Sequence, residues 1–265
     1  MLSHKSLDDI DICTCARPLA GKILLASKVY RVGTAMIDGG IYVGDGLRRI
    51  MDGVGSVLVT HPHPDHAGYC RPVQEWNGAA VYAHQGALGY LSCPVPPPLL
   101  SRRVAGVPRP CLPSTCPETV DAGVVVLRAL DTPGHVPPHL SFIDEDNSRG
   151  FTGDLVLHGS SPWAGPEVHM ADAVDSLERL ASLGLSRLYP GHGRPFDNPG
   201  KDLEEKMAHM RDLGASVRAL HERGLSERDI QVRLLGHEGP VFYGSQGFFS
   251  KRNLIRGYLR CIGSW

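Results

Sequence analysis

The sequence has no long apolar run, no surplus of one charge sign and no pair of cysteines at zinc-knuckle spacing. No apolar run approaches the ~18 residues that a membrane-spanning helix needs, and the first five residues, through Lys5, are unlike a secretory signal. The formal net charge is −1 over 265 residues, which gives no electrostatic reason to bind nucleic acid or anionic lipid. We therefore expect a cytoplasmic protein with no nucleic acid partner and no membrane partner.

The seven cysteines are an odd number, and no two of them form Cys-x-x-Cys, which favours free thiols. A disulfide between Cys111 and Cys116, which lie close together in a proline-rich stretch, stays open. The composition is 42% hydrophobic and 21% charged, as in a globular protein. The length allows one large domain, alone or with a small appendage.

Potential metal ligands are concentrated in residues 60–68, Thr-His-Pro-His-Pro-Asp-His-Ala-Gly, directly after the apolar run 54–59. Neutral imidazoles and a nearby carboxylate suit a divalent cation, although a polar turn with surface histidines is the alternative. His61 and His63 each precede a proline, which favours extended backbone, so their side chains share a face and can bind one metal. We expect Asp65 to cap a helix over 66–76, which directs Asp65 and His66 elsewhere. These four side chains can therefore coordinate two neighbouring metals more easily than one.

The chain up to residue 117 alternates between expected strands and expected helices. We expect strands at 22–27, 34–38, 54–59 and 79–83, and short helices at 41–52 and 85–91. Residues 93–117 contain eight prolines, three cysteines and three arginines without clear periodicity. We interpret them as an insertion loop that forms a lid or contacts a partner, with a disordered insertion as the alternative.

A second series of strands is expected at 124–130, 140–144, 150–152 and 187–189, with a helix at 171–183. Three of these runs end at a possible ligand, namely His135, Asp154 and His192. Loops held by a rigid sheet commonly carry chemistry, so we expect these side chains to meet at one edge. From residue 201 onward the pattern is helical, with a long first helix, a second that begins at Ser226 and a last one over 251–262.

Four motifs in order resemble the metallo-β-lactamase-fold hydrolase superfamily, and more closely its glyoxalase-II-like branch. They are the 60–68 stretch, Thr-Pro-Gly-His at 132–135, Thr-Gly-Asp at 152–154 and Pro-Gly-His-Gly at 190–193. The resemblance implies an α+β fold, a four-layer αββα sandwich. Together with the helical pattern after residue 201, it leads us to expect a catalytic domain over 1–200 and a helical C-terminal extension over 201–265 that packs on the core. The clustered basic and tyrosine residues that grip glutathione in glyoxalase II are not found in this sequence.

The resemblance also implies a dinuclear centre. The first metal would be held by His61, His63 and His135, the second by Asp65, His66 and His192, with Asp154 bridging, and Asp65 and Asp154 would take part in catalysis. The cofactors would be two divalent ions, zinc first, with iron or manganese as alternatives. A metal-bridging hydroxide would then cleave a small ester, thioester, lactone or amide. The partner would be this small-molecule substrate, and a homodimer stays open.

Four further residues are candidates for supporting the ligands or facing the substrate. Asp38 either supports the metal-bearing loop or forms an ordinary Asp-Gly turn. His139 either supports the site or is a satisfied strand histidine, and His158 and His169 could line the pocket mouth.

Three other functions compete with the hydrolase. A mononuclear-iron dioxygenase of persulfides would not need the second group of ligands. A phosphodiesterase or nuclease would be expected to carry a basic surface or a larger insertion. A catalytically silent binding module would be expected to lack a ligand, and all seven are present.

Overall fold

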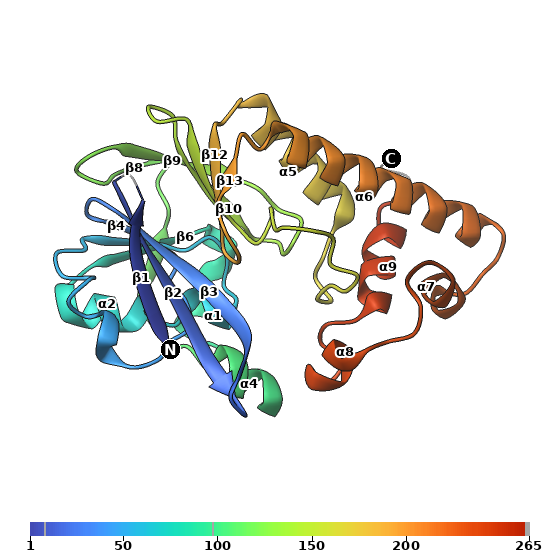
Figure 1. Ribbon diagram of the computed structural model, residues 1–265, viewed down its shortest axis with the longest axis horizontal. Coiled ribbons are helices and arrows are strands. Elements are labelled where there is room, and N and C mark those ends of the chain that lie inside the picture. Colours follow the sequence, from blue (N-terminus) through green and yellow to red (C-terminus); the bar gives the residue numbers. More distant parts are fainter. Residues whose placement is uncertain (8, 97, 263–265) are drawn as a thin grey trace.

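The computed structural model describes residues 1–7, 9–96 and 98–262, which form two mixed sheets with helices on their outer faces (Figure 1). In chain order the first sheet contains β1 (Leu2–Leu7), β2 (Ile10–Leu19), β3 (Lys22–Val32), β4 (Ala35–Ile37), β5 (Ser56–Leu58), β6 (Ala80–Ala83) and β7 (Pro113–Thr115). Neighbouring strands are antiparallel from β1 to β4 and parallel from β4 to β7. The parallel strands β4 and β5 are buried throughout, as the continuous apolar run predicts.

The second sheet has the order β13-β12-β11-β10-β9-β8. Its strands are β8 (Thr119–Asp121), β9 (Val126–Asp131), β10 (Leu140–Asp144), β11 (Arg149–Gly153), β12 (Arg187–Pro190) and β13 (Phe196–Asp197). All neighbours are antiparallel except β11 and β12, which run parallel. The exits of β11 and β12 therefore lie side by side, which brings the residues that follow them together.

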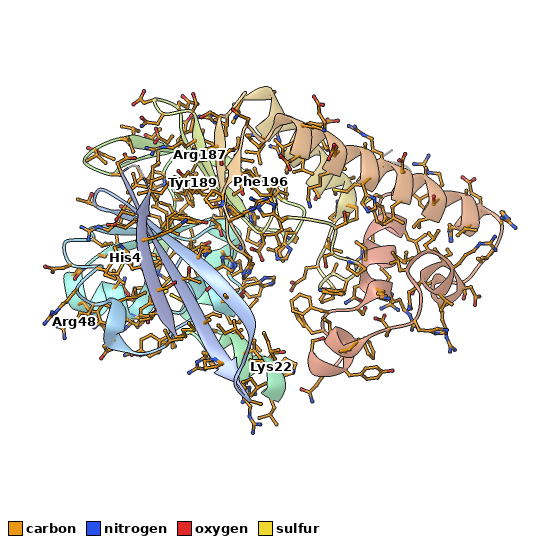
Figure 2. The ribbon with its side chains drawn as sticks, in the orientation of Figure 1. His4, Lys22, Arg48, Arg187, Tyr189 and Phe196 are labelled. Atoms are coloured by element: carbon orange, nitrogen blue, oxygen red, sulfur yellow. The ribbon has the colours of Figure 1, made fainter. Side chains whose placement is uncertain are left out.

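Aromatic side chains fill the space between the two sheets. Tyr30 of the first sheet packs against Phe151 and Tyr189 of the second, each at a ring-centroid distance of 5.4 Å. The Tyr30 hydroxyl donates to the Pro190 carbonyl oxygen at 2.5 Å, which ties the sheets together next to His192. Phe196 of β13 pairs with Leu188 of β12, the neighbour of Tyr189 in the chain. Successive side chains of a strand point to opposite faces, so Phe196 packs with the helices on the outer face while Tyr189 points between the sheets (Figure 2).

Helices cover both outer faces, so the expected helix–sheet–sheet–helix sandwich is confirmed. The first sheet is covered by η1 (Asp45–Leu47), α1 (Pro64–Ala67), α2 (Cys70–Asn77), η2 (Gln85–Ala87) and α3 (Leu88–Ser92). The second is covered by α5 (Met170–Ser182) and α6 (Gly200–Glu222), and α7 (Glu227–Leu235), α8 (Pro240–Gly244) and α9 (Lys251–Leu259) extend beyond these two helices, away from the sheet (Figure 1). Ser226 caps α7 as expected, because its hydroxyl accepts from the Asp229 amide. In the described ranges no helix is both long and apolar enough to cross a membrane.

The division of the chain at residue 200 stays a prediction. One apolar cluster on the outer face of the second sheet contains Val174 and Leu177 of α5 together with Leu203 and Met207 of α6. Residues on both sides of position 200 therefore share one core.

Three expectations about local structure are wrong. The helix over 41–52 reduces to η1, where glycines lie at both 44 and 46. The single helix over 66–76 is split, and His63, not Asp65, occupies the N-cap position because Pro64 suits the first turn. The break comes at Gly68, whose added Cβ would lie 2.4 Å from the Gly40 carbonyl oxygen. Only a glycine lets the two segments approach this closely.

We expected residues 93–117 to form an insertion loop without regular structure, but part of this stretch is regular. They form α4 (Leu99–Ala105) and the strand β7, although Pro97 lies outside the described residues. Arg17 of β2 donates to the Arg102 carbonyl oxygen at 3.3 Å, so α4 rests on the β2–β3 hairpin. Cys111 and Cys116 are both free thiols, as are the other five cysteines.

Candidate metal centre

All seven expected ligands meet where strands of the two sheets end. His61 follows β5, His135 follows β9, Asp154 follows β11 and His192 follows β12. The backbone joins the two sheets at this edge, because the Leu140 amide donates to the Thr60 carbonyl oxygen at 2.8 Å and the Lys28 amide donates to that of Gly191 at 2.8 Å. The site is thus built on the rigid ends of both sheets.

Three histidines form the first ligand group, His61, His63 and His135. The Nδ1 atom of His63 lies 3.1 Å from Nε2 of His61 and 3.2 Å from Nε2 of His135. Ligand atoms around a tetrahedral ion with bonds of about 2.0–2.1 Å are separated by about 3.3–3.4 Å. The spacing of these nitrogens therefore fits a single ion such as zinc.

Asp65, His66 and His192 form the second ligand group. The Asp65 Oδ2 atom lies 3.2 Å from Nε2 of His192 and 3.8 Å from Nε2 of His66. This group is mixed, with one carboxylate and two imidazoles, whereas the first is all imidazole.

Asp154 lies between the two groups. Its Oδ1 atom is 3.4 Å from Nε2 of His66, and its Oδ2 atom is 3.3 Å from Nε2 of His192 and 3.7 Å from Nε2 of His135. A single carboxylate is thereby within reach of both groups. The same residue also forms a third possible group with His61 and His66.

Three buried atoms of the candidate ligands make no hydrogen bond, namely Nε2 of His63, Nε2 of His66 and Oδ1 of Asp154. Buried polar atoms without a partner are rare in folded proteins and cost free energy. The last two lie 3.4 Å apart, and a cation between them would satisfy both. The donor set therefore fits divalent metal.

In three of the candidate histidine ligands, the ring nitrogen that points away from the centre has a hydrogen-bond partner. Nδ1 of His66 donates to Oδ2 of Asp38 at 2.7 Å, and Nδ1 of His192 donates to the Ala26 carbonyl oxygen at 2.7 Å. The Thr60 hydroxyl lies 2.9 Å from Asp38 and 3.0 Å from Nδ1 of His61. These contacts fix the tautomers and leave Nε2 directed at the centre.

Asp38 fulfils both interpretations offered for it. It is 2% exposed and accepts from the Thr60 amide at 2.8 Å, so it supports the loop that carries His61 to His66. Its φ of 60° also places it in the left-handed turn conformation that aspartate tolerates.

The two ligand groups differ in charge. In the first group burial lowers the pKa of His61 and His63, and lowers that of His135 to about 4, so these rings are neutral. Burial acts the same way on His66 and His192. There the neighbouring carboxylates outweigh it, with Asp154 first, and they raise the pKa of His192 to about 10. Nearby charge therefore reverses the effect of burial.

The remaining candidate histidines have different surroundings. His139 is fully buried, its Nδ1 atom lies 3.0 Å from the Thr132 hydroxyl, and its ring stacks on His61 at 5.2 Å. His158 is exposed and stacks on Phe196 at 3.8 Å, near the His192 loop. His169 caps the N-terminus of α5. Of the three, only His139 contacts a ligand.

Two contributors were not anticipated from the sequence. An added Cβ at Gly191 would lie 2.5 Å from Oδ1 of Asp154 and from Cε1 of His66, so glycine is needed there. The Pro-Gly-His-Gly motif carries that signal. The Ala26 carbonyl carries none, because any residue supplies the same backbone atom.

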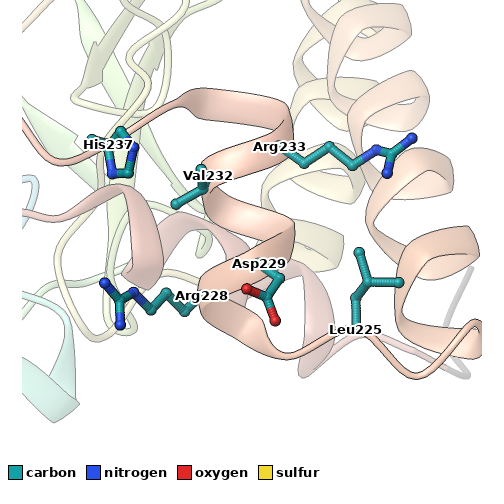
Figure 3. Close-up of a pocket in the computed structure, with 6 residues that line it drawn as sticks. All are labelled: Leu225, Arg228, Asp229, Val232, Arg233 and His237. Carbon is teal, nitrogen blue, oxygen red and sulfur yellow. The ribbon is translucent and has the colours of Figure 1, made fainter.

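Two surface depressions lie apart from the candidate ligands. One of about 450 Å³ is lined by residues of α7 and its flanks, including Leu225, Arg228 and His237 (Figure 3). Another of about 250 Å³ is lined by residues including His84, Cys116 and Asp131. Neither shares a residue with the two ligand groups.

Comparisons with known proteins agree with this geometry. The family model described as the metallo-beta-lactamase superfamily matches residues 29–192. The lactamase-like protein nscB of Trichophyton rubrum is 31% identical over 186 residues, which is 67% of this chain and 50% of that protein. The atrochrysone carboxyl ACP thioesterase of Aspergillus fumigatus is 29% identical over 160 residues, 58% of this chain and 43% of that protein. The chain spans about half the length of the curated relatives it matches.

Two solved structures are similar in fold. A metallo-beta-lactamase family protein from Thermus thermophilus has a TM-score of 0.67 at 23% identity, covering 95% of this chain and 94% of that one. TTHA1623, crystallised in a di-iron-bound form, has a TM-score of 0.55 at 29% identity, covering 68% of this chain and 93% of its own.

Proposed function

The chain belongs to the metallo-beta-lactamase superfamily, and we propose that it is a dinuclear-metal hydrolase that cleaves a thioester. The observation that carries the proposal is the position of Asp154, which lies within 3.7 Å of ligand nitrogens from both groups. One carboxylate between two complete ligand groups is suited to two ions and is not needed for one. The mononuclear dioxygenase would leave the second group without a purpose.

The residues that would hold the ions are the seven expected from the sequence. His61, His63 and His135 would hold the first, and Asp65, His66 and His192 the second, with Asp154 shared. Two divalent ions, when bound, would supply a hydroxide near neutral pH and polarise the carbonyl to be attacked.

The protein's own contribution is to hold these ligands in place. Asp38 fixes the ring of His66, and the Ala26 carbonyl fixes that of His192. The ligands therefore need little rearrangement when substrate arrives, which is the condition for efficient electrostatic stabilisation. In the reaction the acyl carbon–sulfur bond breaks and a carbon–oxygen bond from water forms, giving a carboxylic acid and a thiol.

Thioesters are the substrate class with the most support. The relative from Aspergillus fumigatus is named a carboxyl ACP thioesterase, and the sequence motifs resemble the glyoxalase-II-like branch. Esters, lactones and amides are carbonyl substrates that the same ligands could serve. Zinc is the first choice of metal because the ligand spacing suits it, and iron comes next because TTHA1623 was crystallised with two irons.

The test is a panel of acetyl thioester, ester, lactone, β-lactam, phosphodiester and persulfide substrates. Each is assayed with metal-stripped protein and with protein reloaded with zinc, iron or manganese. We expect thiol release from the thioester only after reloading. Oxygen uptake with the persulfide, without thiol release from the thioester, would replace the hydrolase by a dioxygenase.

A further inference from the structure

The phenylalanines of this chain fall into two sets. Phe142, Phe151 and Phe196 are core residues, at most 5% exposed. The other three of the six, Phe242, Phe248 and Phe249, lie within eight residues of one another and all remain partly exposed. Tyr243 in the same stretch is 71% exposed. Large aromatic side chains usually bury most of their surface, so such a gathering is expected to contact something else.

The segment 155–169 connects this aromatic stretch to the metal centre. It begins directly after Asp154 and ends at His169, whose backbone amide donates to the Gly134 carbonyl oxygen at 2.9 Å, next to His135. Both ends of the segment therefore lie close to candidate ligands, one along the chain and one through a backbone hydrogen bond.

The C-terminal helices pack on the middle of this segment. Ala164 and Ser250 exchange two backbone hydrogen bonds of 3.1 and 3.0 Å. An added Cβ at Gly165 would lie 3.6 Å from the ring of Phe248 and 3.9 Å from that of Phe249. The two rings pack edge to face at 5.0 Å. Trp163, which precedes Ala164, is 38% exposed.

Three basic side chains of α9 and its C-terminal flank are used in structural contacts, whereas the Nε atom of Arg252 in α9 is buried without a hydrogen-bond partner. Lys251 donates to the Leu235 and His237 carbonyl oxygens at 2.6 and 2.8 Å, and Arg256 pairs with Glu227 at 2.8 Å. Arg260 donates to the Pro166 carbonyl oxygen at 2.7 Å. These three cations hold the C-terminal helices to one another and to the segment 155–169. These three cations are therefore not free to bind an anionic substrate.

We propose that Trp163, Phe248 and Phe249 form an aromatic wall that binds a flat, apolar acyl group of the thioester substrate. The inference rests on the proposed function for its chemistry, and for its position on the segment 155–169, which follows Asp154 and pairs with Ser250 next to Phe249. Stacking on aromatic rings and removal of apolar surface from water supply the binding free energy. The wall therefore selects an aromatic acyl group over a small acyl group such as acetyl.

The first test compares N-acetylcysteamine thioesters of 2-naphthoic acid and acetic acid with metal-loaded protein. We expect kcat/KM to be at least about tenfold higher for the naphthoyl thioester, mainly through a lower KM. Trp163→Ala and Phe248→Ala should reduce kcat/KM for the naphthoyl thioester about tenfold more than for the acetyl thioester. Tyr90→Ala, which changes a 54% exposed aromatic residue on α3, is the matched control and should alter neither. Equal kcat/KM for the two thioesters in the unmodified protein would contradict the proposal that the aromatic wall binds the acyl group.

The second test measures binding without catalysis. Calorimetry should detect 2-naphthoate but not acetate binding to the full chain, and Trp163→Ala or Phe248→Ala should weaken that binding about tenfold. If no thioester is cleaved but 2-naphthoate binds in this pattern, the thioesterase proposal fails and the wall stands. If sedimentation shows a dimer that Tyr243→Ser converts to monomer, and 2-naphthoate does not bind, the aromatic face is a contact between copies and the wall is wrong.

Discussion

The two ligand groups of the candidate metal centre lie a few ångströms apart, yet their imidazoles differ in protonation. The first group is neutral, because burial lowers the pKa of His61, His63 and His135. The second contains protonated imidazoles at neutral pH, because the carboxylates of Asp154 and Asp65 outweigh burial at His66 and His192. An ion entering the first group displaces no proton, whereas an ion entering the second competes with protons. We therefore expect the first group to fill first.

Removing the shared ligand should have the largest effect, because it damages both groups. Asp154→Ala should reduce kcat/KM on the thioester on the order of 10³-fold or more and lower the metal content. Metal analysis and thiol-release kinetics measure both. Asp131→Ala, at another strand end, is the control and should retain both ions. Full turnover by Asp154→Ala would show that this carboxylate does not bridge the groups.

Removing one ligand at a time, from one group and then from the other in separate variants, should show that the two groups bind metal independently. His135→Ala and His192→Ala should each lower the metal content from about two ions per chain to about one, because each destroys one tetrahedral set. Metal titration by calorimetry should show which binding step disappears, the tighter in His135→Ala and the weaker in His192→Ala. His158→Ala should keep both steps. Loss of the same step in both variants would mean that the groups are not independent.

Changing Asp38 should distinguish the groups more finely. Asp38→Asn keeps the left-handed backbone but weakens the hydrogen bond that holds Nδ1 of His66. We expect the affinity of the second group for metal to fall about 10–100-fold. The first group should lose less, because Asp38 reaches His61 only through Thr60. An equal loss at both groups, measured by the same titration, would contradict this difference.

The smallest effect concerns the stability of metal-stripped protein against pH. His135 has a pKa of about 4 when folded, so its contribution to stability is lost as the pH falls from about 6.5 towards 4. His192 has a pKa of about 10 when folded, so its contribution is lost as the pH rises from about 6.5 towards 10. His135→Gln should flatten the acid side of the melting-temperature profile and His192→Gln the alkaline side. The reverse assignment would contradict a neutral His135 and a protonated His192.

The same contrast explains what the sequence could predict about the site. The seven candidate ligands could be selected from the sequence, and they lie together in the structure, because imidazole and carboxylate side chains at strand ends carry a recognisable signal. The charge state of each ligand could not be predicted, because it depends on how close Asp154 lies to His66 and His192 in the folded chain. The Ala26 carbonyl was missed for a similar reason, since a backbone atom leaves no mark in the sequence.

The fold was predictable where strands form continuous apolar runs, and it was missed at the N-terminus, where neither β1 nor β2 was expected. The strands β5 and β6 stand out as apolar runs, and both were expected. The strand β1 is an exposed edge, with its four central residues open to solvent, and shows no apolar periodicity. The helix break at Gly68 depends on the approach of Gly40, a contact between segments that no local pattern contains. His169, a candidate for lining the pocket mouth, also caps α5, a role that histidine seldom takes and that the sequence did not indicate.

The central claim is that two ions share one carboxylate, and metal analysis of protein purified without chelator tests it most directly. We predict about two divalent ions per chain, with anomalous scattering placing them ~3.5–4 Å apart on either side of Asp154. A single iron per chain, together with oxygen uptake in the presence of a persulfide, would contradict it.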